Sequence, residues 1–165
     1  MPDARAAGVS LSEHFTVDEL IESQTAARLG LDNTPPEDVV ANLRLLCETI
    51  LEPARQALGP LRISSGYRAP IVDDAIPRTA PNVRPSAHRF GYAADVIPLQ
   101  ARKLDFARWV YDKVPVNQII LEFGTAEEPA WVHVSAAPPG HVSAAPPGAR
   151  VLRILAGTGY EPVTL

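Results

Sequence analysis

The sequence predicts an α+β domain in which N-terminal helices pack on a small, mainly antiparallel sheet. Helical patterns fill the N-terminal part of the chain, and strand patterns separated by turns dominate the remainder. Helices followed mostly by strands favour this class over an alternating α/β fold. A length of 165 residues fits one domain with a substantial core. We expect residues 1–10 to be a flexible lead-in and residues 11–165 to form the single domain.

The amino-acid composition indicates a globular protein and argues against some classes of function. Hydrophobic residues make up 46% of the chain, and the mean hydropathy is close to zero, as is typical of globular proteins. The net charge is -4 and the pI is about 5.5, which argues against a broad nucleic-acid-binding surface. Cys47 is the only cysteine, so the chain can form no internal disulfide.

Two kinds of apolar segment are not found in the sequence. Met1–Ala7 has no apolar stretch of the kind that signal peptides carry. No apolar run approaches the roughly 20 residues of a membrane-spanning helix. We therefore expect cytoplasmic synthesis without a signal peptide, and no membrane span.

The helical segments are predicted from capping signals and apolar spacing. Thr16 opens a capping box, so a short helix is expected over residues 16–23. A further helical turn over residues 26–29 ends at a glycine. Apolar residues at three- and four-residue steps predict the main amphipathic helix over residues 37–57, with a kink or break at Pro53.

The rest of the chain combines strand patterns with turn signals. Residues 69–87 carry four prolines and are expected to form a long loop, a feature that is usually functional or mobile. Residues 101–114 fit a second amphipathic helix. The predicted strands cover residues 61–64, 92–97, 118–123, 131–135 and 151–155. The third and fourth of these are expected to pair as antiparallel strands.

An eight-residue segment occurs twice in succession. His133–Gly140 has the sequence HVSAAPPG, and His141–Gly148 repeats it. Two short copies cannot stack into a repeat domain, so the pattern indicates a local duplication. The first copy continues a strand pattern, whereas the second follows Pro-Pro-Gly and is expected in a surface loop. We therefore prefer His133 over His141 as the functional histidine.

The most informative feature is a set of three polar residues: His88, Asp95 and His133. Imidazole and carboxylate groups are usual zinc ligands, and three of them leave a fourth position open for water. A turn at Gly91 would let the first two side chains point toward one place. The alternative is three unrelated polar residues, since a histidine followed seven positions later by an aspartate is not a specific metal pattern by itself.

Four short segments around these residues, taken together, indicate how to interpret them: Ser65–Arg68 (SGYR), Ser86–His88 (SAH), Gly91–Asp95 (GYAAD) and Trp131–Ser135 (WVHVS). They resemble the zinc D-Ala-D-Ala carboxypeptidases and related murein peptidases, the M15 peptidase type with a hedgehog-like fold. The resemblance runs from about residue 11 to about residue 138. Leu11–Thr16 and the region around Arg28 also resemble the phage-encoded branch.

The resemblance implies roles for individual residues. His88, Asp95 and His133 would be the zinc ligands. Arg68 would be the electrophilic catalytic partner, which holds a substrate carboxylate or stabilises the oxyanion; its alternative is a structural ion pair at a strand end. The residues expected to shape the site or contact substrate are Ser86, Tyr67 and Trp131.

Three glutamates are candidates for the general base. A carboxylate must take the proton of the attacking water and pass it to the leaving amine. Relatives place it three residues before the last histidine, which is Ala130 here, or at the end of the preceding hairpin strand, which is Glu122. We favour Glu122, because a carboxylate in an apolar strand needs a partner such as a metal. Glu128 and Glu127 are the alternatives, and a solvated loop position is the competing interpretation for each.

The function implied by the resemblance is zinc-dependent hydrolysis of peptide bonds in peptidoglycan stem peptides, as a D,D-carboxypeptidase or an endopeptidase. A phage lysis enzyme (endolysin) or a virion-associated murein peptidase, acting on the cell wall after release, fits the expected lack of a signal peptide. The alternatives are a non-catalytic zinc-stabilised cell-wall-binding or phage tail structural module, and a hydrolase of small free dipeptides. The same ligands also suit nickel, cobalt or iron.

One loop departs from the family pattern. Where relatives commonly have Asn and a pair of glycines after the SGYR segment, this chain has Asp73 and Ile76–Pro77. The resemblance therefore does not predict the conformation of this loop or the choice of substrate.

Overall fold

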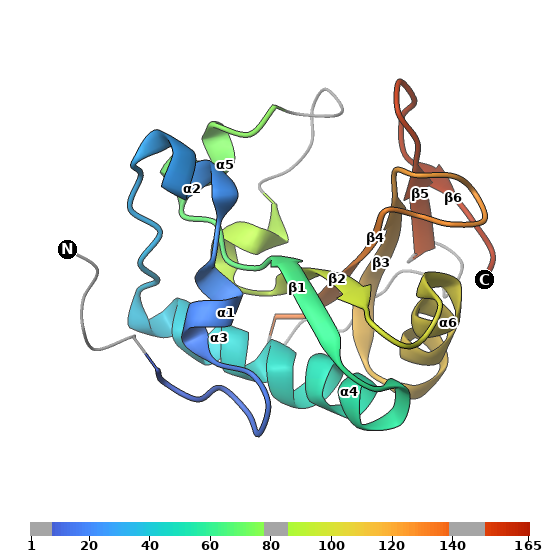
Figure 1. Ribbon diagram of the computed structural model, residues 1–165, viewed down its shortest axis with the longest axis horizontal. Coiled ribbons are helices and arrows are strands. Elements are labelled where there is room, and N and C mark those ends of the chain that lie inside the picture. Colours follow the sequence, from blue (N-terminus) through green and yellow to red (C-terminus); the bar gives the residue numbers. More distant parts are fainter. Residues whose placement is uncertain (1–7, 78–85, 139–150) are drawn as a thin grey trace.

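We describe residues 8–77, 86–138 and 151–165 of a computed structural model, which form an α+β fold (Figure 1). The helical elements are α1 (Val17–Ile21), α2 (Gln24–Leu29), α3 (Glu37–Leu46), the π-helical η1 (Cys47–Leu51), α4 (Glu52–Leu58), α5 (Pro70–Asp74), the 3₁₀-helical η2 (Ala87–Phe90) and α6 (Lys103–Lys113). The strands are β1 (Leu61–Ser65), β2 (Ala93–Pro98), β3 (Val116–Glu122), β4 (Trp131–Ala136), β5 (Val151–Ile154) and β6 (Glu161–Pro162). The predicted fold class is confirmed.

The six strands of the described residues form one sheet in the order β1-β2-β4-β3-β5-β6. All neighbouring pairs are antiparallel except β3 and β5, which are parallel. Asp95 of β2 lies directly opposite His133 of β4, and Glu122 of β3 lies opposite Trp131 of β4. Because residues two apart on a strand share a face, these four side chains all project from the same face of the sheet.

The opposite face of the sheet packs on the helices. Its central side chains are buried and apolar: Ala94, Val96, Ile119, Leu121, Val132 and Val134. They belong to one hydrophobic cluster with α3 residues such as Leu43 and Leu46. In Figure 1, α3 and α4 run along the bottom of the view, and α6 lies at the lower right. The core therefore fixes which face of each central strand carries the polar side chains.

The main helix is continuous over α3, η1 and α4, with a π-helical turn at its middle. Pro53 has no N–H, so the carbonyl four residues earlier loses its usual donor. The turn just before it widens, and the Glu52 N–H donates to the Cys47 carbonyl. The predicted kink or break at Pro53 is thus a local change of helix type, as is common where the hydrogen-bond ladder is interrupted.

Two short elements differ from the predictions. Residues 69–87 were expected to be loop, but α5 occupies residues 70–74 with Pro70 at its first position, where a missing N–H costs nothing. Beyond β5, the short strand β6 pairs with it, and Arg153 contacts Glu161 across the pair at 3.0 Å. His141 and its predicted surface loop lie outside the described residues.

Glu52, which is only 7% exposed, binds Ser12 and His14 of the N-terminal segment and so holds this segment against the main helix. Its carboxylate accepts hydrogen bonds from the Ser12 hydroxyl at 2.6 Å and the His14 backbone N–H at 3.0 Å. The His14 ring nitrogen Nδ1 lies 2.5 Å from the other oxygen. Burial opposes ionisation, but these hydrogen bonds outweigh it and lower the pKa of the Glu52 carboxyl below its ordinary value.

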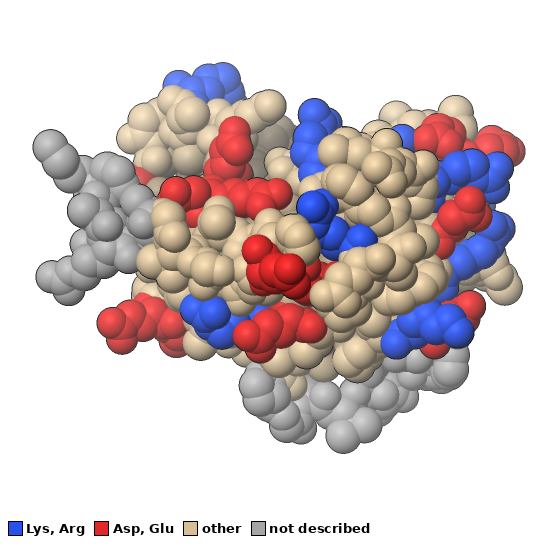
Figure 2. Space-filling model, turned by 60° about the horizontal axis from the view of Figure 1, so that its bottom comes forward, with Lys and Arg blue, Asp and Glu red and all other residues tan. Residues whose placement is uncertain are grey.

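Charges of both signs share the surface shown in Figure 2. On that face, Lys and Arg side chains lie among Asp and Glu side chains, and the described residues there form no continuous basic band. None of the described helices is long and apolar enough to cross a bilayer.

We predict that Glu52→Gln lowers the free energy of unfolding by about 2 kcal/mol at neutral pH, because hydrogen bonds to a charged acceptor are stronger than those to an amide. Chemical denaturation measures this loss. Glu48→Gln is the matched control, because Glu48 is exposed and lies one helical turn earlier.

This contribution also depends on pH. Since the folded-state pKa of Glu52 is lowered, its stabilisation is fully present above the ordinary value of 4.5 and is lost as the pH falls through the folded-state value. The difference between wild type and Glu52→Gln should therefore shrink in acid. A difference that stays constant with pH, or an equal loss in Glu48→Gln, would contradict this role.

Candidate metal centre

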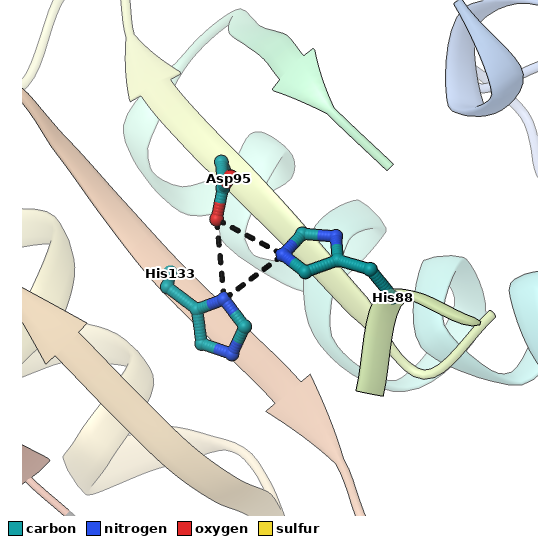
Figure 3. Close-up of side chains that lie close together, drawn as sticks. All are labelled: His88, Asp95 and His133. Atoms are coloured by element: carbon teal, nitrogen blue, oxygen red, sulfur yellow. Dashed lines mark hydrogen bonds and ion pairs between the residues drawn. The ribbon is translucent and has the colours of Figure 1, made fainter. Parts of the chain in front are cut away.

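Three side chains that are distant in the sequence converge on one point: His88, Asp95 and His133 (Figure 3). His88 Nε2 lies 3.2 Å from His133 Nδ1 and 3.3 Å from Asp95 Oδ1, and His133 Nδ1 lies 3.1 Å from the same Asp95 oxygen. All three residues are buried, with exposures of 2%, 4% and 6% in chain order. The predicted convergence of these three side chains is present.

Regular secondary structure and one tight turn bring them together. Asp95 and His133 face each other across the β2–β4 pair. His88 lies on η2, whose first turn is capped by the Ser86 hydroxyl, which accepts from the His88 N–H at 3.3 Å. Gly91 ends η2 with φ 77°, and a Cβ there would lie 2.8 Å from the Val39 carbonyl oxygen. Glycine is therefore required at this turn on two counts.

The carbonyl of Gly66 orients the His88 ring. His88 Nδ1 lies 2.7 Å from the Gly66 oxygen, and a carbonyl only accepts, so Nδ1 carries the proton. In the neutral ring, Nε2 then presents its lone pair to the other two groups, as a second hydrogen bond often arranges in metal sites. Gly66 itself must be glycine, because a Cβ would lie 2.2 Å from the Leu20 carbonyl oxygen.

The donor set fits a zinc ion. Two imidazole nitrogens and a carboxylate oxygen are typical zinc ligands, and ligands about 2.0–2.1 Å from a tetrahedral ion lie about 3.3 Å from one another. The three measured separations, 3.1–3.3 Å, match this spacing. Lone pairs from Asp95 and His88 point at one buried place, where a cation would satisfy them together. Three protein ligands leave a fourth position for water or substrate.

The Asp95 carboxylate has a different partner on each oxygen. Oδ1 faces the two histidines, whereas Oδ2 accepts from Arg68 at 3.2 Å. Burial alone would raise the pKa of Asp95, but the charges and hydrogen bonds of His88 and His133 hold it well below its ordinary value. Asp95 is thus ionised at neutral pH and ready to bind a cation.

Glu122 is the acidic side chain beside this cluster. Its Oε1 lies 3.9 Å from His133 Nδ1, and its side chain is 15% exposed. Burial, followed by the negative charge of Asp95, raises the pKa of Glu122 to about 7. The two alternatives lie elsewhere, since Glu127 is exposed and Glu128 is exposed and pairs with Lys103 at 2.7 Å.

The remaining predicted residues occupy different positions around the cluster. Arg68 lies beside it, whereas the Tyr67 ring is 3% exposed and belongs to the hydrophobic core. Trp131 lies opposite Glu122, and its buried indole N–H makes no hydrogen bond of good geometry among the described residues, but its proximity to the Glu122 carboxylate partly offsets the rise in the pKa of Glu122. Ser86 caps η2. Tyr67 therefore shapes the turn after β1 from inside the core.

Sequence reasoning missed the orienting carbonyl of Gly66. The glycine at the end of a strand pattern was a usable signal, because glycine in such a place often marks a close backbone approach. Which carbonyl faces His88 follows only from the folded positions of β1 and η2.

We predict that Glu122 titrates near pH 7 in the metal-free protein, because burial disfavours its charged form. Nuclear magnetic resonance of the side-chain carboxyl carbons follows this titration, and the signal that disappears in Glu122→Gln assigns it. A Glu122 signal that titrates around the ordinary value of 4.5 would show that the carboxylate is solvated.

The comparisons with known proteins agree with this geometry. A family profile described as Peptidase M15 matches residues 13–135, a segment that contains the three clustered residues, Arg68 and Glu122. Among curated proteins, none matches the sequence. M15 peptidases are in general zinc-dependent. The profile covers more than half of the chain, and the chain therefore belongs to the M15 family of metallopeptidases.

Proposed function

We propose that this protein hydrolyses peptide bonds in peptidoglycan stem peptides with the help of a zinc ion, as a D,D-carboxypeptidase or an endopeptidase. The observation that carries this proposal is the buried cluster of His88, Asp95 and His133 with the Glu122 carboxylate beside it. Membership of the M15 family supports the reaction class. A purely structural metal site would have no need of a largely buried glutamate next to its ligands.

His88 Nε2, Asp95 Oδ1 and His133 Nδ1 would hold the zinc ion. When bound, the ion supplies a Lewis acid that polarises the scissile carbonyl and makes water a better nucleophile. The protein orients these ligands through the Gly66 carbonyl behind His88 and the Arg68 guanidinium behind Asp95. Fixing the ligands in this way keeps the donor atoms aimed at one point.

Glu122 is assigned as the general base. Its carboxylate accepts a proton from the attacking water and then delivers that proton to the nitrogen of the leaving amine. A pKa close to the working pH suits both transfers, because the same group must take up a proton and release it. The raised pKa of about 7 belongs to the metal-free site, and a cation nearby would lower it.

Arg68 is assigned as the electrophilic partner. Its guanidinium lies beside the metal ligands, where it can stabilise negative charge on the carbonyl oxygen as the tetrahedral centre forms. Trp131 and Ser86 would contact the substrate, with Trp131 beside Glu122 and Ser86 also capping the turn that carries His88. For the setting we propose phage lysis or a virion-associated murein peptidase, because Leu11–Thr16 and the region around Arg28 resemble the phage-encoded branch.

We predict that the purified protein binds one zinc ion and that His88→Ala and His133→Ala each abolish this binding, because either change leaves only two protein ligands. Elemental analysis of dialysed protein measures the zinc content. The control is His141→Ala, the same change in the second copy of the repeat. Loss of zinc in His141→Ala but not in His133→Ala would show that the other copy supplies the ligand.

We also predict that Glu122→Gln keeps its zinc and its fold but loses at least about 100-fold in kcat, the usual contribution of a general base. Release of soluble peptides from intact sacculi, and of D-alanine from a D-Ala-D-Ala peptide, measures turnover. Glu128→Gln is the control, because Glu128 is an exposed glutamate of the same hairpin. Full activity in Glu122→Gln would remove it as the base, and activity in neither assay for wild type would favour a non-catalytic cell-wall-binding module.

A further inference from the structure

The guanidinium of Arg68 has a partner on each of its three nitrogens. Nε donates to the Ser65 hydroxyl at 3.0 Å, one terminal nitrogen donates to Asp95 at 3.2 Å, and the other donates to Asp73 at 3.3 Å. Asp95 and Asp73 therefore flank the same cation from two sides. The Arg68 side chain remains 16% exposed, so it is within reach of a ligand in the site.

Asp73 is held firmly in this arrangement. Its second oxygen accepts from Arg89 Nε at 2.7 Å, and its side chain is 11% exposed. Arg89 also contacts Asp74, the next residue of α5. Because two guanidinium groups hold the two oxygens of Asp73, its carboxylate occupies a defined position next to Arg68 and is not free to swing away.

We propose that Asp73 is a specificity-determining residue that excludes a free substrate carboxylate from Arg68. The site would then prefer peptides in which the residue after the scissile bond is followed by a further amide. It would disfavour peptides in which that residue carries the C-terminal carboxylate. This inference rests on the proposed function and deepens it, because it assigns the protein endopeptidase rather than carboxypeptidase specificity.

The physical reason lies in charge and geometry. An arginine that captures a substrate carboxylate offers two parallel N–H groups and an uncompensated positive charge. Here each terminal nitrogen of Arg68 already donates to a carboxylate, one to Asp73 and the other to Asp95. A third carboxylate on Arg68 would also lie within a few ångström of Asp73 and be repelled by it. A neutral carbonyl oxygen meets no such repulsion and can still accept from Arg68.

The test compares two peptides that differ only in this charge: diacetyl-L-Lys-D-Ala-D-Ala with a free C-terminal carboxylate, and the same peptide with a C-terminal amide. Binding is measured by calorimetry on the zinc-loaded Glu122→Gln protein, so that no turnover is required. Asp73→Asn removes the charge with little change of shape, and Asp73→Ser is a second neutral variant. Asp74→Asn is the matched control, with the same loss of charge one residue along α5.

We expect the amide to bind at least about tenfold more tightly than the acid, and Asp73→Asn to tighten binding of the acid by about tenfold. Binding of the amide should stay within about twofold, and Asp74→Asn should change neither peptide. The inference is overturned if neither neutral variant at position 73 tightens binding of the acid selectively, or if Asp74→Asn does so equally. If the binding pattern holds but protein with Glu122 intact cleaves neither these peptides nor intact sacculi, the proposed peptidase function fails with its endopeptidase assignment, whereas the exclusion of a carboxylate by Asp73 stands.

Discussion

The antiparallel register between β2 and β4 is the constraint on which the site depends. It sets Asp95 opposite His133 and turns both side chains to the polar face of the sheet. A slip of one residue in either strand would send one of the two into the apolar core. The buried neighbours that oppose such a slip are Ala94, Val96, Val132 and Val134. Hydrophobic packing on one face therefore fixes the chemistry on the other.

Two further ion pairs connect Asp95 to Arg68 and Arg68 to Asp73. Asp95 presents one oxygen to the histidines and the other to Arg68, and Arg68 in turn contacts Asp73. A buried carboxylate is costly unless positive charge meets it, and Arg68 together with the proposed metal ion meets this requirement on both oxygens. Arg68 is therefore shared by the group that would hold the metal ligands and the group that we propose selects the substrate.

The sequence predicted the parts of this account that follow from periodicity and residue chemistry. The fold class, the β3–β4 hairpin and the meeting of His88, Asp95 and His133 are all present. The π-helical turn, α5 and β6 were not predicted, because each depends on local hydrogen bonding or tertiary pairing. Departure from the family pattern had drawn attention to Asp73, but its two arginine partners become neighbours only in the fold.

X-ray absorption spectroscopy of the zinc-loaded protein tests the central claim most directly, because it reports the atoms around the ion itself. We predict nitrogen and oxygen donors alone at about 2.0–2.1 Å, with the outer-shell scattering of two imidazole rings and a fourth light-atom ligand from solvent. A sulfur donor at about 2.3 Å, which only Cys47 or Met1 could supply, would contradict it. Scattering from three imidazoles, or from one, would do the same.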